Sequence, residues 1–465
     1  MSTRLTTLAA GFSGSVAAIA LAIAPQLHAE DLLQSYELAR ASDPQLQITE
    51  AARNIAAEGI VQARSALLPQ ISASAGYQHS KNNFPLKDSV SRVVVGSGTG
   101  TTNANDYGAQ LNQSIYDHAN YTRLKAAKAQ AESTDASYRA AEQALLVRVA
   151  TAYFQVLTAQ DSLTSSQAEE KAVGRQLEQA EQRYNVGLTA ITDVHEARAR
   201  HDGAVAAAIL SENALDDAKA ALTELTGKTI DSVVVVRAEI PLVPPSPADW
   251  QTWVESAIKF SPTLAARVAD TKAFEQQIAT AKAARYPTVT SNFNYSNNGS
   301  RSTSDLSFNN STPGRSVSST DDSDGSSIGI NVNIPLFSGF NTSSRIRQAV
   351  LDSEVSKDRL EQERRAITRA TRNAYRSVIA GVSEVGARKQ ALVSAKSALE
   401  ATEAGFEVGT RTIVDVLLSQ QVLFQAQRDY SQARHNFLVN GLRLKSSAGT
   451  ITLDDLKEVN ALLSE

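Results

Sequence analysis

The sequence contains no cysteine and a single methionine. The missing thiols exclude disulfides, thiolate metal sites and lipid attachment through a cysteine. Aromatic residues make up only 6% of the 465 residues, which suits long helices better than large compact cores. Beyond the N-terminal segment no run of about 18 apolar residues occurs, so the sequence provides no transmembrane helix. A membrane-crossing form would require a closed barrel of strands.

The first 29 residues are predicted to form a secretory signal peptide. Arg4 is the only charged residue before Glu30, residues 8–25 are mostly small and apolar, and residues 27–29 offer a small-residue cleavage site. The alternative is a membrane-anchoring helix, for which the apolar stretch is short. Loss of Arg4 changes the formal charge from −4 to −5, a mild acidity that argues against nucleic acid as a partner.

The chain reads as two tandem repeats, because residues of the first half recur in the second at nearly constant offsets. Pro44, Pro69 and Tyr77 recur 218 residues later as Pro262, Pro287 and Tyr295, and Tyr153, Val186, Gly187, Ile191, Asp193 and Val194 recur 222 residues later as Tyr375, Val408, Gly409, Ile413, Asp415 and Val416. We therefore expect repeat 1 at residues 30–240, a stiff proline-rich linker at 241–247, repeat 2 at 248–449 and a short acidic tail at 450–465.

Each repeat is predicted to begin with helices and to continue into a pair of β-strands. Hydrophobicity alternates with period two at about residues 70–80 and 106–116, and again at about 288–297 and 327–337. The polar face is uncharged and the segment within each pair is predicted to be a polar loop. Such strands match those of outer-membrane barrels, although hairpins half buried on a soluble core would also alternate. Four strands cannot close a barrel, whereas three copies would provide 12.

A long helical hairpin is predicted to follow each strand pair. Residues 120–184 contain no proline and one glycine, and at 1.5 Å per residue they make a rod of about 100 Å. Residues 342–406 form the equivalent rod, and residues 192–226 and 412–447 are the expected antiparallel return helices. Small residues, chiefly alanine, follow a coiled-coil spacing along the first rod. This pattern favours a wall one helix thick around a lumen.

The turns at the hairpin tips, near residues 185–193 and 407–415, carry the most specific pattern in the chain. Each combines a glycine that suits a left-handed C-terminal cap with a pair that suits an N-terminal capping box. The expected caps are Gly187 and Gly409, and the expected capping pairs are Asp193 with Glu196 and Thr412 with Asp415.

Capping does not account for Arg411, because its counterpart in repeat 1 is the neutral Thr189. An arginine in only one of two similar turns predicts a specific acidic partner. The simplest candidate is Asp193 of the neighbouring hairpin.

At these tips the sequence closely resembles the TolC-type outer-membrane efflux and secretion channel family. The resemblance covers essentially the whole mature chain, including the closing segment at residues 440–450. It implies a mainly α-helical membrane channel built from two repeats, in which a trimeric 12-stranded barrel in the outer membrane of a Gram-negative bacterium continues into a periplasmic α-helical barrel. The implied partners are outer-membrane lipid, two further copies, a periplasmic adaptor and an inner-membrane translocase of the resistance-nodulation-division, ABC or major-facilitator type.

The resemblance also implies roles for residues at the tips. A latch would close the tunnel, an acidic ring would line its constriction, and the turns would dock the adaptor. The implied latch residues are Arg411, Asp193, Thr192 and Phe406, the ring residue is Asp415, and the docking turns are Val186, Gly187, Leu188, Val408, Gly409 and Thr410. Phe406 departs from the family pattern because it lacks a tyrosine hydroxyl that could bond Thr192, and Leu418 stands where a second lumen acid would be.

No catalytic, cofactor-binding or metal-binding motif is found. The six histidines show no metal-ligand spacing, and the glycine-rich residues 96–100 lack the Lys-Ser/Thr of a phosphate loop. The alternative function is a trimeric surface-anchored coiled-coil protein with a structural or adhesive role. Such a protein would place its strands at one end of the chain, whereas here they interrupt it twice.

Overall fold

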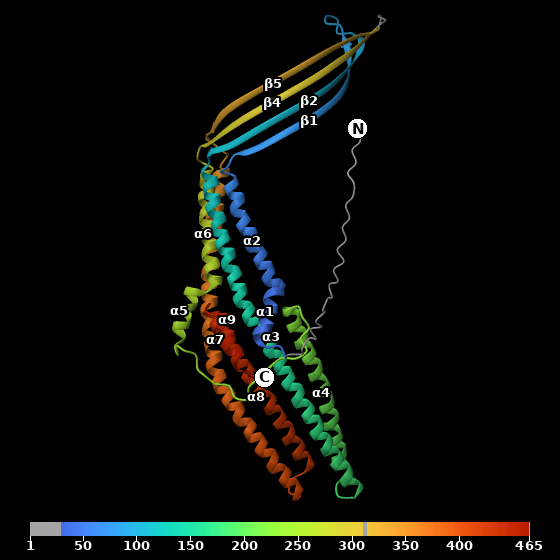
Figure 1. The fold of residues 1–465 in the computed structure, drawn as a ribbon, viewed down its shortest axis with the longest axis vertical. Helices are drawn as coiled ribbons and strands as arrows, with labels where there is room; N and C mark the ends of the chain where they lie inside the picture. Colours follow the sequence, from blue (N-terminus) through green and yellow to red (C-terminus); the bar gives the residue numbers. More distant parts are fainter. Residues whose placement is uncertain (1–28, 310–313, 465) are drawn as a thin grey trace, which may run out of the picture.

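The computed structural model describes residues 29–309 and 314–464. The predicted signal peptide, residues 1–29, therefore lies outside the described residues except for its last position. The molecule is elongated, with a β-sheet at one end and helices running to the opposite end (Figure 1). In chain order the elements are α1 Leu32–Ser42, α2 Pro44–Ser65, β1 Gln70–Lys87, β2 Val94–Tyr116, α3 His118–Asn185, α4 Ile191–Thr226, β3 Val235–Val236, α5 Trp250–Phe260, α6 Pro262–Ala283, β4 Thr288–Phe308, β5 Arg315–Asn333, α7 Asn341–Glu407, α8 Ile413–Ser447, α9 Leu453–Asn460 and β6 Leu463–Ser464.

The large sheet is antiparallel, with the strand order β1-β2-β4-β5. Its rows alternate in character across all four strands. One row pairs Ile71, Leu111, Phe293 and Ile328, and the adjacent row pairs Ser72, Gln110, Asn294 and Ser327. Since successive rows point to opposite faces of a sheet, one face is apolar and the other polar. Ile71 and Ile328 are 76% and 80% exposed in the single chain, so the apolar face has no cover within the protomer.

The strands run further than the sequence predicts. Most residues of the segments expected to be polar loops are paired with a neighbouring strand. Residues 96–100, for example, lie inside β2 rather than in a loop. The hydrogen bonds between strands are made by the backbone and need no apolar side chains. Stretches of serine, threonine and asparagine can therefore extend the strands beyond the segments in which hydrophobicity alternates. In contrast, β5 ends at Asn333 rather than near residue 337, because Pro335 lacks the N–H that a ladder requires.

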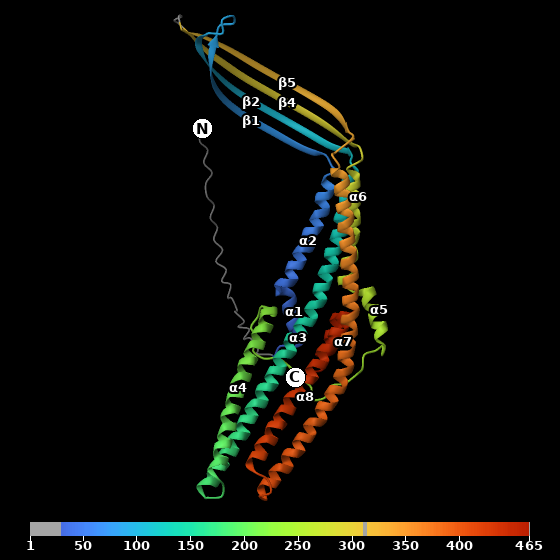
Figure 2. The ribbon, with the colours of Figure 1, turned by 180° about the vertical axis from the view of Figure 1, so that it is seen from behind.

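The long helices run side by side in a wall that reaches from the sheet to the far tips (Figures 1 and 2). Helices α3 and α7 contain 68 and 67 residues and run most of its length, about 100 Å each. Next to the sheet, the order across the wall is α2-α3-α6-α7, and towards the far tips it is α4-α3-α8-α7. The protomer therefore has two open lateral edges, formed by α2 and α4 on one side and by α7 on the other.

A hydrophobic core at mid-height joins the two repeats. Tyr153 of α3 is fully buried there, and its hydroxyl donates hydrogen bonds to the carbonyl oxygens of Glu30 (3.1 Å) and Val234 (2.8 Å). The predicted C-terminal tail takes part in this belt, because its α9 packs on α8 and its β6 pairs with β3. Among the described residues, no helix has the length and apolar character needed to span a membrane.

Candidate gate at the helical tips

The two hairpin tips have the same backbone geometry. Gly187 and Gly409 both have positive φ, +75° and +80°, a conformation that suits glycine because it has no Cβ. At the first tip, the N–H of Leu188 donates to the carbonyl of Arg183 (2.8 Å) and that of Gly187 to the carbonyl of Tyr184 (2.9 Å). The second tip repeats both bonds, so each long helix ends in a Schellman motif.

The return helices begin differently at the two tips. Thr412 and Asp415 form the predicted capping box at the start of α8. The backbone N–H and hydroxyl of Thr412 donate to the Asp415 carboxylate, each at 2.9 Å, and these bonds lower its pKa, with a further contribution from Arg411. At the first tip, the predicted pairing of Asp193 with Glu196 is wrong.

Helix α4 has Ala190 at its N-cap and no side-chain cap. The Asp193 carboxylate instead accepts a hydrogen bond from the hydroxyl of Thr189. Ala190 has no side-chain acceptor that could cap the helix, and the neighbouring Thr189 donates to Asp193 without capping α4. Thr189, singled out by sequence only as the neutral counterpart of Arg411, is thus the partner of Asp193 within the chain.

Arg411 lies against the end of its own hairpin. Its backbone N–H donates to the carbonyl of Gly405 (3.1 Å), and its side chain crosses Gly405 so closely that a Cβ there would meet Arg411 Cγ at 2.8 Å. Within the described part of this single chain, Arg411 forms no ion pair with Asp193 or any other carboxylate. Its side chain is exposed to solvent in the single chain.

A small apolar cluster, called the tip cluster below, joins all four helices near the tips. It contains Val173, Ala180, Val194, Ala197, Ile413 and Leu417, with Leu177 and Phe406 packed against it. The guanidinium of Arg183 lies over the Phe406 ring, with Cζ 4.7 Å from the ring centroid. The sequence predicts that Phe406 lies at the tip, but it does not predict the contact with Arg183. No local sequence pattern relates the end of α3 to the end of α7.

Comparison with known proteins identifies the family to which this chain belongs. A model of the outer membrane efflux protein family matches residues 35–228 and 253–450. The chain belongs to the outer membrane efflux protein family. It is 36% identical to the outer membrane protein TolC of Vibrio cholerae over 436 residues, covering 93% of this chain and 94% of that protein. It is 35% identical to TolC of Escherichia coli, covering 94% of this chain and 86% of that protein.

Solved structures agree on the fold. The CmeC outer membrane channel of Campylobacter jejuni superposes with a TM-score of 0.72 at 15% identity, covering all of this chain and 98% of that one. The family membership makes this protein a channel of the Gram-negative outer membrane, with most of its mass in the periplasm, rather than an enzyme. The tips described above are accordingly the periplasmic end of an outer-membrane efflux channel.

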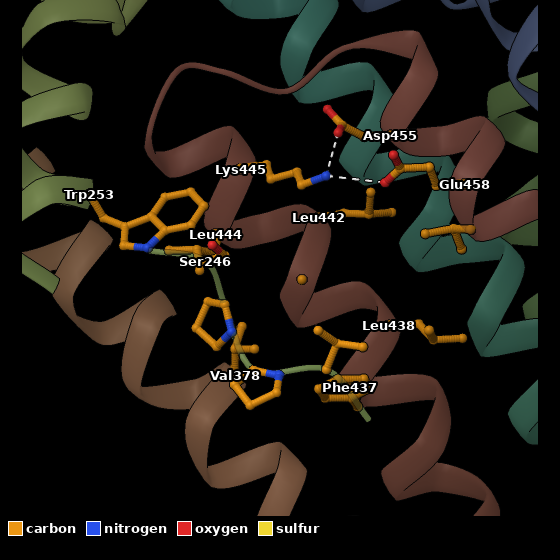
Figure 3. Close-up of a pocket in the computed structure, with 15 residues that line it drawn as sticks. Ser246, Trp253, Val378, Phe437, Leu438, Leu442, Leu444, Lys445, Asp455 and Glu458 are labelled. Atoms are coloured by element: carbon orange, nitrogen blue, oxygen red, sulfur yellow. Dashed lines mark hydrogen bonds and ion pairs between the residues drawn. The ribbon is translucent and has the colours of Figure 1, made fainter. Parts of the chain in front are cut away.

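The channel also has a mid-height cavity of about 370 Å³ where the proline-rich linker crosses α7 and α8 (Figure 3). Its walls are mainly apolar, and Trp253 fixes the linker by donating from Nε1 to the carbonyl of Pro247 (2.9 Å). At one end Lys445 reaches Asp455 and, at 3.4 Å, Glu458. Burial alone would lower the pKa of Lys445, but these carboxylates outweigh it and raise the pKa. The two ion pairs tie α9 to α8 at this end of the cavity.

No group of three or more His, Asp or Glu that could hold a metal ion occurs among residues 29–309 and 314–464. The histidines there serve other contacts, such as the buried His435 beside Thr158.

Proposed function

We propose that three copies of this chain close into one tunnel, which serves as the exit duct for drug efflux and type I protein secretion. The observation that carries the proposal is the pair of open edges that every protomer has along its whole length. Strands β1 and β5 leave unpaired backbone groups at the sheet edges, and three four-stranded sheets give a closed 12-stranded barrel. Among the relatives, the alkaline protease secretion protein AprF of Pseudomonas aeruginosa, 27% identical, supports the secretion role.

The edge helices support the same assembly. Ile48, Ile55 and Val61 of α2 are all exposed in the single chain, Ile55 by 72%, and so is Leu351 of α7. Placing α2 of one protomer beside α7 of the next buries both sets, as the hydrophobic effect favours. The polar face of the sheet then lines the lumen, and the apolar row through Ile71 and Ile328 faces lipid.

The protein should leave the membrane in mild detergent only as a trimer that conducts ions in planar bilayers. Native mass spectrometry of the purified protein gives the assembly, and single-channel recording of the same sample gives the conductance. Replacing Ile55 by glutamate should reduce the trimer fraction, because it places a charge in the seam between protomers. A stable folded monomer in the wild type would contradict the closed barrel.

We further propose that the resting channel is closed at the tips by Arg411 of one protomer and Asp193 of the next. Asp193 lies in the first turn of α4, at one lateral edge of the wall, and Arg411 lies in the α7–α8 turn at the other edge. In a closed ring these edges meet. Thr192 is exposed beside Asp193 and Phe406 is half-buried beside the Arg411 turn, so both belong to the same contact zone.

Removing the Arg411 side chain should raise the conductance of the closed channel. A partly exposed ion pair contributes only about 0–1 kcal/mol, but three pairs act in one ring, so Arg411→Ala should open the resting channel measurably in planar bilayers. The matched control is Arg198→Ala, because Arg198 pairs with Glu181 at 2.6 Å within a single hairpin and should leave the closed conductance unchanged. Equal conductance in Arg411→Ala and wild type would remove Arg411 from the latch.

The exposed turns are the surfaces at which we propose that a periplasmic adaptor docks and an inner-membrane translocase opens the channel. Each turn exposes apolar side chains at the extreme tip; Val408 is 75% exposed, and Val186 and Leu188 are similarly open. Gly187 and Gly409 keep each turn tight, and Thr410 completes the second one. Contiguous apolar groups at the end of a rod are typical of a protein interface. The partner that binds at these turns determines which translocase and which cargo the channel serves.

A further inference from the structure

The contact between Arg183 and Phe406 joins the two hairpins of one protomer. Arg183 is in the last turn of α3 and Phe406 is in the last turn of α7, so the contact spans α8, which lies between those helices. A guanidinium within about 6 Å of an aromatic centroid is attracted by the negative face of the ring. With 4.7 Å between Cζ and the centroid, the pair meets that condition.

The surroundings of the pair favour this interaction over solvent. Both side chains are half-buried, and the ring packs against the tip cluster, so water competes less for the guanidinium. In the described part of the chain, Arg183 has no ion pair with a carboxylate. The aromatic ring is therefore its specific partner across the hairpins.

The two repeats could in principle form two equivalent contacts of this kind, but the sequence allows only one of them. The counterpart of Phe406 in repeat 1 is Tyr184, which is exposed, and the counterpart of Arg183 in repeat 2 is Gly405, which has no side chain. Gly405 is needed where it is, because the Arg411 side chain crosses it. At the second tip the Arg411 side chain therefore covers Gly405, and the cation over the Phe406 ring comes from Arg183 of the first tip.

We infer that Arg183 is a second element of the latch, which holds the α7–α8 hairpin against α3 within each protomer by a cation–π contact with Phe406. The inference rests on the proposed gating function. It gives Phe406 a positive role in closure in place of the missing tyrosine hydroxyl. Arg183 acts as a positioning residue, because it fixes the hairpin that carries Arg411 rather than contacting the next protomer.

Single-channel recording of the trimer in planar bilayers tests the pair, with Arg183→Gln, Phe406→Leu and the double variant. A cation–π contact at a half-exposed site corresponds to about a two- to fivefold change in an equilibrium constant. If the three protomers open together, the changes of the three equilibrium constants multiply. The open fraction of each single variant should therefore be about tenfold to a hundredfold higher than that of the wild type. The double variant should match the larger single effect rather than the product of both. Arg175→Gln, an exposed arginine on the same helix, should leave the open fraction unchanged.

Two conservative variants separate a cation–π contact from simple packing. Arg183→Lys should give an intermediate open fraction, and Phe406→Trp should lower it, because tryptophan binds cations best. The Phe406→Trp effect should vanish when Arg183 is glutamine, whereas packing alone would preserve it. Independent effects of the two sites, or an unchanged open fraction in Arg183→Gln, would overturn the inference while the Arg411→Ala response still upheld the proposed gate. A wild-type trimer without conductance would overturn both.

Discussion

Acidification from about pH 7.5 to about pH 4.5 should destabilise each protomer by about 2–3 kcal/mol through His435 alone. His435 lies on α8 in the interface with α3 and is only 3% exposed. Its ring stands 5.7 Å from that of Phe154, measured between centroids. Burial lowers its pKa to about 4; the charge of Asp161 opposes that shift, and that of Arg434 adds to it.

The hydrogen bonds around His435 define the tautomer of its neutral ring. The hydroxyl of Thr158 donates to the carbonyl of Phe154 (2.7 Å), so its oxygen accepts a hydrogen bond from Nδ1 of His435 (2.8 Å). Nε2 then has no proton, and it stands 3.9 Å from a carboxylate oxygen of Asp161. That oxygen already accepts the hydroxyl of Ser431, so Asp161 offsets only part of the cost of a buried imidazolium.

The sign of the effect follows from the two pKa values. The unfolded chain takes up a proton at His435 as the pH falls through about 6.5, whereas the folded chain does not until about pH 4. Between these values the proton favours the unfolded state, so the stability present at neutral pH is progressively lost as the pH falls. Protonation acts on the α3–α8 interface, which connects the hairpins of repeat 1 and repeat 2.

Thermal loss of the detergent-solubilised trimer, followed by native gel at a series of pH values, measures this contribution. Wild type should lose trimer at a lower temperature as the pH falls from about 6.5 to about 4, and His435→Gln should lose much of that dependence. His195→Gln is the matched control, because His195 is exposed on α4. The same carboxylates are present in all three proteins, so only the difference between their pH profiles counts. Parallel pH profiles for wild type and His435→Gln would contradict the prediction.

The long helices could be predicted closely from sequence because their signals are local. The absence of proline between residues 120 and 184 sets the length of the first rod, and Gly187 marks its end through its positive φ. The structure places α3 at His118–Asn185, within two residues of the prediction at each end. Likewise, Thr412 and Asp415 stand at the spacing of a capping box and form one.

What sequence could not predict depends on contacts between distant segments. The strands extend beyond the segments in which hydrophobicity alternates, because partner strands supply the backbone hydrogen bonds. In serine-rich stretches this pairing has no recognisable sequence pattern. Asp193 accepts a hydrogen bond from the hydroxyl of Thr189 and does not form the predicted capping pair with Glu196. The N-cap position of α4 is occupied by Ala190. The contact of Arg183 with Phe406 joins residues that are more than two hundred positions apart, and only the fold brings them together.

Trivalent cations should block the closed channel only modestly, and the block should depend on Asp415. We propose that the three Asp415 carboxylates of the trimer surround the constriction. Leu418, one helical turn further along α8 and exposed, contributes no charge. The pKa of Asp415 is lowered by its bonds from Thr412, so the carboxylate stays ionised at neutral pH and remains so until well into the acid range. Coulomb attraction to a multivalent cation grows with each charge in the ring, so Leu418→Asp should tighten the block by about tenfold or more.

Asp415 also caps α8, so its two roles must be separated. Asp415→Asn removes the charge but keeps an oxygen that can accept from the N–H of Thr412, whereas Asp415→Ala removes both. Titration of a trivalent cation against single-channel current should show the block abolished in both variants, because it depends on charge alone. If the cap mattered instead, Asp415→Asn would retain the block. Block that survives in both variants would place the narrowest acidic ring elsewhere, since only carboxylates close to the conduction path act across the short screening length of salt solution.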